Sequence, residues 1–309
     1  MRKIMVFYIF LLIVLLLLIV APLVLGTVYW TTLLYTLLLH IILAESWNII
    51  GGFGGQVFLG TAAFFGWGAY TSAMLYYAGV PFAACILLAG FSAACLAFIL
   101  TPTFKLRGVY FVVGSLFISE IMKTIVLTLP IFGGAAGIML PVFRERVLFT
   151  YYSAFLLMLV VFLITLFITR SKIGIALRAI RDDQEAAEIF GINSTMFKLL
   201  ALVITSLLCG MAGGIHAFYM IYVEPHSFFS ISWNIIPVFT VLIGGTSTIM
   251  GPIIGTAIYT LLRELFIFVT GEIYLTVLGA LLIVVMLIAP SGVYPAFTKA
   301  IHRVQKRIR

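Results

Sequence analysis

Residues 174–191 read GIALRAIRDDQEAAEIFG, a polar stretch within a chain of 309 residues that is 64% hydrophobic and only 9% charged. The charged residues between positions 170 and 198 are Arg170, Lys172, Arg178, Arg181, Asp182, Asp183, Glu185, Glu188 and Lys198. A single charge at the centre of a membrane helix costs about 2.5–3.5 kcal/mol on insertion scales. Together these charges make insertion prohibitive, so residues 170–198 are expected to lie in water.

Apolar runs of about 20 residues recur on both sides of this stretch, and the mean hydropathy is +1.26. Each run is long enough to cross a hydrocarbon core of about 30 Å as a helix, and the runs lack the alternation of a membrane β-barrel. We therefore predict an all-α, polytopic helix bundle in the cell membrane that forms a single transmembrane domain over residues 1–309. About ten spans are expected, at residues 4–25, 28–50, 54–78, 82–101, 109–129, 148–169, 198–222, 233–249, 252–270 and 272–289.

The basic residues indicate the orientation of these spans. Lys and Arg gather at the two termini, near residue 105 and in residues 170–181. Cytoplasmic loops carry an excess of Lys and Arg, so we expect the N- and C-termini, residues 170–198 and a tail at 290–309 to be cytoplasmic. The net charge of +8 is then explained without nucleic-acid binding, which would need a solvated domain. Residues 4–25 are too long for a signal peptide and lack a clean cleavage site, so we interpret them as an uncleaved first span.

The polar stretch also contains signals for a short helix near residues 183–190. Asp182 and Glu185 have the spacing of a capping box, and Gly191 suits the C-terminal cap. Isolated helices of about two turns are marginal in water, so either the rest of the chain or a partner must hold this one. Asn193 or Ser194 is expected to cap the membrane helix that follows.

Two glycine-rich segments, residues 51–60 and 244–255, make the span ends uncertain. Glycine allows close helix contact and also allows a helix to break where it lines a cavity, so either segment could be a broken or re-entrant helix. The sequence SWNII occurs at Ser46–Ile50 and again at Ser232–Ile236, each time before a double glycine. This repetition is compatible with two related halves, from which many transporters are built.

Four motifs occur in an order that resembles a known family. They are LGTAAFFGWGAYTSAML (Leu59–Leu75), LRGVYF (Leu106–Phe111), EAA with a following glycine (Glu185–Gly191) and VLIGGTSTIMGPIIG (Val241–Gly255). Over nearly its whole length after the first span, the chain resembles the LivM-type permease subunits of ATP-binding-cassette (ABC) importers for branched-chain amino acids. It departs from the usual family pattern at Phe58, Thr61, His226 and Ser247, and at Ser247 a glycine is usual.

The resemblance implies a membrane permease that forms, with a second, LivH-like permease, the path for branched-chain or other hydrophobic amino acids. It also implies two cytoplasmic ABC ATPases and an extracytoplasmic solute-binding protein. Residues 170–198 would then be the coupling loop that docks in a groove of an ATPase. The coupling residues implied are Arg178, Arg181, Asp182, Asp183, Glu185, Ala186, Ala187, Glu188 and Gly191.

The chain contains no GxxxxGK[ST] phosphate-binding loop, so ATP and Mg²⁺ are expected on the partner ATPase and no cofactor in this chain. Its histidines lack the spacing of metal ligands, and no Ser/His, HExxH or paired-carboxylate constellation suggests an enzyme. We therefore expect neither a metal site nor catalytic residues.

Polar residues within membrane spans are candidates for function by default. The candidates for the translocation path are Glu45, Asn48, Gln56, Thr61, Tyr70 and Glu120. Lys123 lies three residues after Glu120 on the same helix face, so an internal ion pair is the alternative role of this carboxylate.

Two alternative functions remain open at the sequence level. An ion-coupled secondary transporter would suit the glycine-rich helices and Glu120, although the ordered polar loop argues against it. An ABC importer of the same class that carries urea or amides fits the sequence as well. The sequence also leaves open whether the partner permease is a different chain or a second copy of this one.

Overall fold

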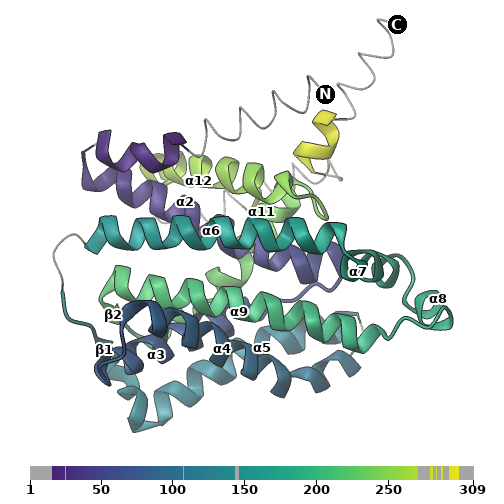
Figure 1. Cartoon of the computed structure of the whole chain (residues 1–309), viewed down its shortest axis with the longest axis horizontal. Coiled ribbons are helices and arrows are strands. Elements are labelled where there is room, and N and C mark those ends of the chain that lie inside the picture. Colours follow the sequence, from purple (N-terminus) through teal and green to yellow (C-terminus); the bar gives the residue numbers. More distant parts are fainter. Residues whose placement is uncertain are drawn as a thin grey trace, which may run out of the picture.

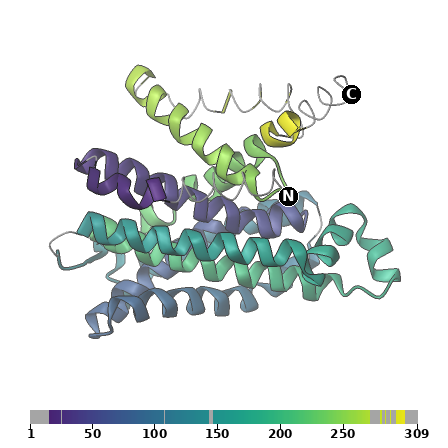
Figure 2. The same cartoon turned by 45° about the horizontal axis from the view of Figure 1, so that its top comes forward.

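The computed structural model describes residues 16–24, 26–106, 108–142, 146–270, 279–280, 283, 287 and 292–298. The expected first span (4–25), tenth span (272–289) and C-terminal tail (290–309) fall mostly outside these residues. Within them, the protein is a bundle of long helices, most of which run roughly side by side (Figures 1 and 2).

The α-helices with printed bounds are α2 (Val28–Asn48), α3 (Thr61–Tyr77), α4 (Phe82–Ile99), α5 (Val109–Thr128), α6 (Arg146–Arg170), α7 (Lys172–Asp182), α8 (Gln184–Ile189), α9 (Ser194–Met220), α10 (Pro225–Phe228), α11 (Ser232–Gly244) and α12 (Met250–Thr270). A π-helix, η1 (Ile49–Phe53), continues α2, and three 3₁₀ turns are η2 (Thr101–Lys105), η3 (Pro130–Phe132) and η4 (Gly134–Ala136). Two short strands, β1 (Ile138–Met139) and β2 (Tyr222–Val223), pair antiparallel between the loops that follow α5 and α9.

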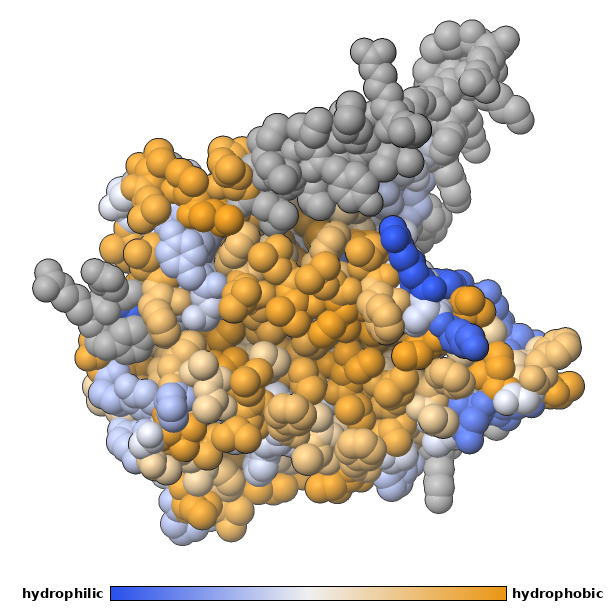
Figure 3. Space-filling model, viewed as in Figure 1, coloured by the Kyte–Doolittle hydropathy of each residue, from blue (hydrophilic) through white to orange (hydrophobic). Residues whose placement is uncertain are grey.

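Helices long and apolar enough to cross a membrane confirm a polytopic, all-α membrane protein. The described residues contain six such segments: 28–53, 82–99, 109–128, 146–170, 194–220 and 225–244. The surface agrees with this, because Figure 3 shows a broad apolar face along the bundle, while strongly hydrophilic side chains gather at the end that carries α7 and α8.

Helix α9 lies at the centre of the packing and contacts α2, α3, α4 and α6. Its glycines provide the closest contacts: Gly210 meets the backbone of α4, and Gly213 meets the backbone of α3 at Phe65. In membranes, small residues at a helix interface let two backbones approach closely, which increases van der Waals contact. The tight α3–α4–α9 group therefore follows from the placement of glycine and alanine.

Two of the expected spans are shorter than predicted, and both differences involve the glycine-rich segments. The third helix begins at Thr61 instead of residue 54, because η1 is followed by non-helical backbone at residues 55–60. The eighth ends at Gly244 instead of residue 249, and its 13 residues cover only about 20 Å at 1.5 Å per residue. Both segments were apolar enough to be read as membrane helix, but positive φ angles at Gly55 and Gly245 interrupt the helical backbone.

Candidate functional site

The polar stretch forms two helices, α7 and α8, where a single short helix was predicted. Helix α7 buries Gly174, Leu177 and Ile180 against the bundle. These positions are three residues apart, which is the spacing of one helix face, so the sequence did contain a signal for α7. Arg178 donates to the backbone oxygen of Thr169 at the end of α6, at 3.4 Å.

Capping confirms the short helix but corrects its first residue. Asp183, and not Asp182, is the N-cap of α8, and its carboxylate accepts a hydrogen bond from the backbone nitrogen of Ala186 at 3.0 Å. Asp182 is the last residue of α7, and its carboxylate accepts from Arg181 Nε at 2.9 Å and Nη2 at 2.7 Å. The predicted cap was wrong by one residue because α7 extends through Asp182.

The C-terminal cap of α8 is as predicted. Gly191 has a φ of +85°, a left-handed conformation that glycine adopts without strain. The backbone nitrogen of Ile192 donates to Ala187 O, and that of Gly191 donates to Glu188 O, both at 3.0 Å. This pair of hydrogen bonds is a Schellman motif. Asn193 then caps α9, because its side chain accepts from Met196 N at 3.0 Å.

The chain itself holds α8 in place, through hydrogen bonds to α9. Gln184 Nε2 donates to Glu188 Oε1 at 2.9 Å and to Ser194 Oγ at 3.2 Å, and Ser194 also bonds to Glu188. Lys198 is only 6% exposed, and its ammonium donates to Gln184 Oε1 at 2.7 Å. A helix of six residues is therefore held by a partly buried polar network with α9.

One side of α8 is left open to solvent. Ile189 is 85% exposed and Phe190 is 86% exposed, although both are large apolar side chains. Glu185, one turn earlier on the same helix, is also exposed. The end of the molecule that is richest in charge thus presents two adjacent apolar side chains on a helix that is held rigidly.

Beside α7, the structure brings together three segments that are far apart in the sequence, and we call this place the α7 junction (Arg181, Ser247, Gly52 and Asn48). Arg181 of α7 donates from Nη1 to Ser247 Oγ in the loop between α11 and α12. Ser247 Oγ in turn donates to the backbone oxygen of Gly52 in η1. Asn48, at the end of α2, accepts from Ser247 N at 3.1 Å and donates to Thr248 O at 2.9 Å.

The geometry of the α7 junction depends on two unusual backbone positions. A Cβ atom on Gly52 would overlap Asn48 Oδ1 and lie 2.9 Å from Ser247 N, so only glycine permits this approach. Ser247 has a φ of +58°, which is uncommon for a residue with a side chain. Its hydroxyl bonds to both Arg181 and Gly52, which compensates for this conformation.

The repeated SWNII sequences provide two comparable buried asparagines. Asn48, in the first copy, bonds to the loop after the late glycine pair, as described above. Asn234, in the second copy, accepts from Ala62 N at 2.7 Å, directly after the early glycine segment, and donates to Ser119 Oγ at 3.1 Å. Each copy therefore satisfies backbone near the glycine segment that follows the other copy.

The six path candidates lie in different environments. Asn48 belongs to the α7 junction, and Tyr70 donates to Val223 O at 3.3 Å near the other end of α3. Glu120 forms the ion pair with Lys123 that was the alternative, and its side chain is 44% exposed. Gln56 is half-buried.

The other two candidates are buried without hydrogen bonds. Glu45 is 1% exposed and Thr61 is fully buried. Neither the carboxylate of Glu45 nor the hydroxyl of Thr61 has a hydrogen-bond partner among the described residues. Buried polar atoms of this kind are rare in proteins, so both residues stay candidates for function.

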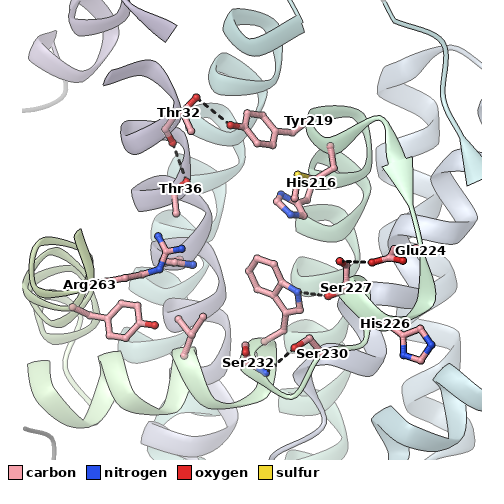
Figure 4. A pocket seen from close by; sticks show the side chains of 15 residues that line it. Thr32, Thr36, His216, Tyr219, Glu224, His226, Ser227, Ser230, Ser232 and Arg263 are labelled. Atoms are coloured by element: carbon pink, nitrogen blue, oxygen red, sulfur yellow. Dashed lines mark hydrogen bonds between the residues drawn. The ribbon is translucent and has the colours of Figure 1, made fainter. Parts of the chain in front are cut away.

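A cavity of about 700 Å³ lies between α2, α9, α10, α11 and α12 (Figure 4). Its lining residues are Thr32, Thr36, His40, His216, Tyr219, Met220, Glu224, His226, Ser227, Ser230, Ser232, Trp233, Ile236, Tyr259 and Arg263. The α9 residues among them belong to the end of α9 that is far from α7 and α8 (Figure 1). The cavity and the α7 junction are therefore at opposite ends of the bundle.

The predicted path candidates do not include any residue that lines this cavity, and the sequence signal for the cavity was weak. Its residues come from five helices and the loops between them, so no linear motif joins them. One signal was present: Thr32, Thr36 and His40 are four residues apart and share one face of α2. The remaining lining residues required the tertiary structure.

Comparisons with known proteins agree with the resemblance. Residues 29–286 match the family described as branched-chain amino acid transport system, permease component. The chain is 30% identical, over 290 residues, to the high-affinity branched-chain amino acid transport system permease protein LivM of Salmonella typhimurium and of Escherichia coli, covering 83% of this chain and 68% of each relative. A probable branched-chain amino acid transport permease protein LivM of Methanocaldococcus jannaschii is 27% identical over 55% of this chain and 51% of that protein. No solved structure matches the chain.

Proposed function

The chain belongs to the permease family of branched-chain amino acid transport systems, and on this premise we propose that it is one of two permease subunits of an ATP-driven importer. With a second, LivH-like permease it would form the path for branched-chain or other hydrophobic amino acids across the cell membrane. Two cytoplasmic ATPases would bind ATP and Mg²⁺, and an extracytoplasmic solute-binding protein would deliver the amino acid.

The observation that carries the proposal is the exposed apolar tip of α8. Ile189 and Phe190 are more than four-fifths exposed, at an end of the molecule where neighbouring side chains are charged. Burying large apolar side chains in a partner is favourable, at about 25 cal/mol per Å². A groove on an ATPase would cover them, and the hydrogen bonds between α8 and α9 would transmit force from that groove to a membrane helix.

The structure suggests how the nine coupling candidates divide. Arg178 and Glu188 contact the ends of α6 and α9, Arg181 contacts the α7 junction, and Asp182 pairs with Arg181. Asp183 and Gly191 cap α8, and Ala187 is buried. Because Glu185, Ile189 and Phe190 are exposed on α8 and at its end, we infer that they face the ATPase. Most of the other charged residues bind α7 and α8 to this chain.

We propose an orientation and a number of spans on the same basis. Residues 170–198 would be cytoplasmic, and the cavity would open toward the extracytoplasmic half. About ten spans with both termini in the cytoplasm place most Lys and Arg residues inside. The short α11 would be a half-length helix that begins within the membrane, beside the cavity, and ends at the cytoplasmic side, next to the α7 junction.

The alternative functions have less support. An ion-coupled secondary transporter is not favoured, because the chain belongs to the family above and Glu120 is paired with Lys123 at an exposed position. An importer of urea or amides would use the same architecture. Uptake assays with leucine and urea separate these two solute classes.

The experiment replaces Phe190 by Asp in the assembled importer reconstituted in liposomes. ATP-driven leucine uptake should fall at least tenfold, because a charge would be placed where an apolar partner surface is expected. The same substitution at Met196, which is 63% exposed at the same end but lies on α9, serves as the control and should retain uptake. Equal uptake by the Phe190→Asp variant and the wild type, with the ATPase still bound, would contradict the proposed role of α8.

A further inference from the structure

The cavity has the dimensions of a small-molecule site. Its volume of about 700 Å³ lies within the 300–1,000 Å³ that is usual for ligand pockets. It is lined by elements that are distant in sequence, and the α9 residues in its lining belong to the end of α9 that is away from α7 and α8.

The charges of the lining select for a dipolar solute. Among the described residues of the lining, Glu224 is the one acidic residue and Arg263 is the one residue with a permanent positive charge. Figure 4 shows that Arg263 of α12 and Glu224, which precedes α10, lie on opposite sides of the hollow. A zwitterion carries both charges and therefore complements this pair across the hollow, whereas an ion of one sign complements only one of the two groups.

Two buried imidazoles add hydrogen-bonding capacity between these charges. His216 is 7% exposed, and its Nδ1 is 3.1 Å from the hydroxyl of Tyr35. His40 is 3% exposed, and its Nδ1 has no hydrogen-bond partner in the part of the chain that the structure describes. A buried polar atom without a partner is costly, which indicates that a ligand or water completes the site.

Aromatic rings supply the apolar part of the lining. The ring centroid of Trp233 is 5.2 Å from that of His216 and 6.1 Å from that of His40. The ring centroid of Tyr259 is 5.8 Å from that of His40. Ring faces bury aliphatic groups and also attract an ammonium ion. The cavity thus combines an apolar wall with a carboxylate and a guanidinium.

We propose that this cavity binds the hydrophobic amino acid itself, as a zwitterion, during its passage. The solute's carboxylate would face Arg263 and His40, its ammonium group would face Glu224, and its side chain would contact Trp233 and Tyr259. This inference rests on the proposed function and adds to it a binding site within this permease, separate from the site on the solute-binding protein.

The test measures protection of a cysteine in the cavity. Ser230, which lines the cavity, is replaced by Cys, and its alkylation in the purified importer is followed by mass spectrometry in the absence of the solute-binding protein. Bound leucine should slow alkylation of the cysteine that replaces Ser230. Two analogues with the same side chain should protect at least tenfold more weakly: 4-methylpentanoate, which lacks the ammonium group, and 3-methylbutylamine, which lacks the carboxylate.

Charge variants identify the groups that recognise the solute. Arg263→Gln and Glu224→Gln, each combined with Ser230→Cys, should raise the leucine concentration for half-protection about tenfold or more. Arg263→Lys should restore most of the protection. Glu264→Gln is the matched control, because Glu264 neighbours Arg263 but accepts from Tyr29 at 2.6 Å and does not line the cavity.

The outcomes separate the two proposals. If the wild-type importer takes up leucine with ATP, but leucine does not protect position 230 or the analogues protect equally, the binding site is wrong and the importer proposal stands. If the wild type shows no ATP-driven uptake of branched-chain amino acids, the proposed function fails. Should Arg263→Gln not assemble, the comparison of leucine with its two analogues still decides the question.

Discussion

At the end of the bundle next to α7, Asn48 and Ser247 lie in a close-packed contact in which each hydrogen-bonds to a neighbouring segment. At the opposite end, His40 lines a cavity of about 700 Å³, and its Nδ1 has no partner among the described residues. His40 and Asn48 are both buried polar residues of α2 and lie eight residues apart along this helix. The chain itself satisfies the side chain of Asn48, whereas it leaves His40 Nδ1 without a partner among the described residues.

The α7 junction and the cavity are therefore suited to two different functions, transmission of movement and binding of a solute. Transmission of movement requires segments that shift together, and hydrogen bonds between α7, η1 and the α11–α12 loop provide a continuous contact for this. Binding of a solute requires groups that are placed in advance but left available. The π-helix η1 is part of the contact that transmits movement. Single π-helical turns are rare in proteins, and those that occur are often at functional sites.

The largest expected effect is at Gly52. Gly52→Ala should lower the free energy of unfolding by about 2–3 kcal/mol, as overpacking does, because the new methyl group overlaps Asn48 and approaches Ser247 N. If Asn48 rotates away, Ser247 N loses its acceptor, so no simple adjustment relieves the strain. Thermal unfolding of the purified chain and leucine uptake by the importer measure the loss.

Gly114→Ala is the control for this substitution. Gly114 lies in α5, and a Cβ atom there meets only the end of the Leu106 side chain, at 3.0 Å. This variant should retain stability and uptake. Comparable losses in both variants would show that the α7 junction is not specially close-packed.

The next effect concerns the left-handed backbone at Ser247. Ser247→Val should lower the free energy of unfolding by about 1–2 kcal/mol, because a β-branched residue is strained at φ +58° and the hydroxyl contacts are lost. Ser247→Gly also loses the hydroxyl but relieves the backbone, so its stability should stay near that of the wild type. Parallel unfolding measurements on the two variants distinguish strain from hydrogen bonding, and equal losses would assign the whole effect to the hydroxyl.

The sequence predicted the end of the bundle that carries α7 and α8 better than it predicted the cavity, for a physical reason. Capping and amphipathic spacing act over a few residues, so Gly191, Asn193 and the existence of α8 could be predicted from neighbours in the chain. The one-residue error at Asp182 arose because two adjacent aspartates offer the same cap. Only the extent of α7 decides between them.

The cavity and the helix breaks depend on contacts between distant segments. Residues 55–60 are apolar enough to continue a membrane helix, and the break there is supported by Asn234, which lies 172 residues after its partner Ala62. Their polarity within an apolar span was enough to identify Glu45 and Thr61 as candidates. Arg263 could not be identified as a candidate in this way, because a charged residue near a helix end normally extends to the membrane surface. No local pattern shows that Arg263 lines a cavity instead.

The smallest expected effect compares the two buried histidines of the cavity. His216→Phe should lower the free energy of unfolding by about 1 kcal/mol, since the buried hydroxyl of Tyr35 loses its partner at 3.1 Å. His40→Phe removes a nitrogen that makes no hydrogen bond within the described residues, so the free energy of unfolding should be unchanged or rise by up to about 1 kcal/mol. Leucine protection of the cavity should nevertheless weaken in His40→Phe. A variant that is as stable as the wild type but binds leucine less well would show that this imidazole is kept for the solute, whereas a clear loss of stability would mean that it supports the fold.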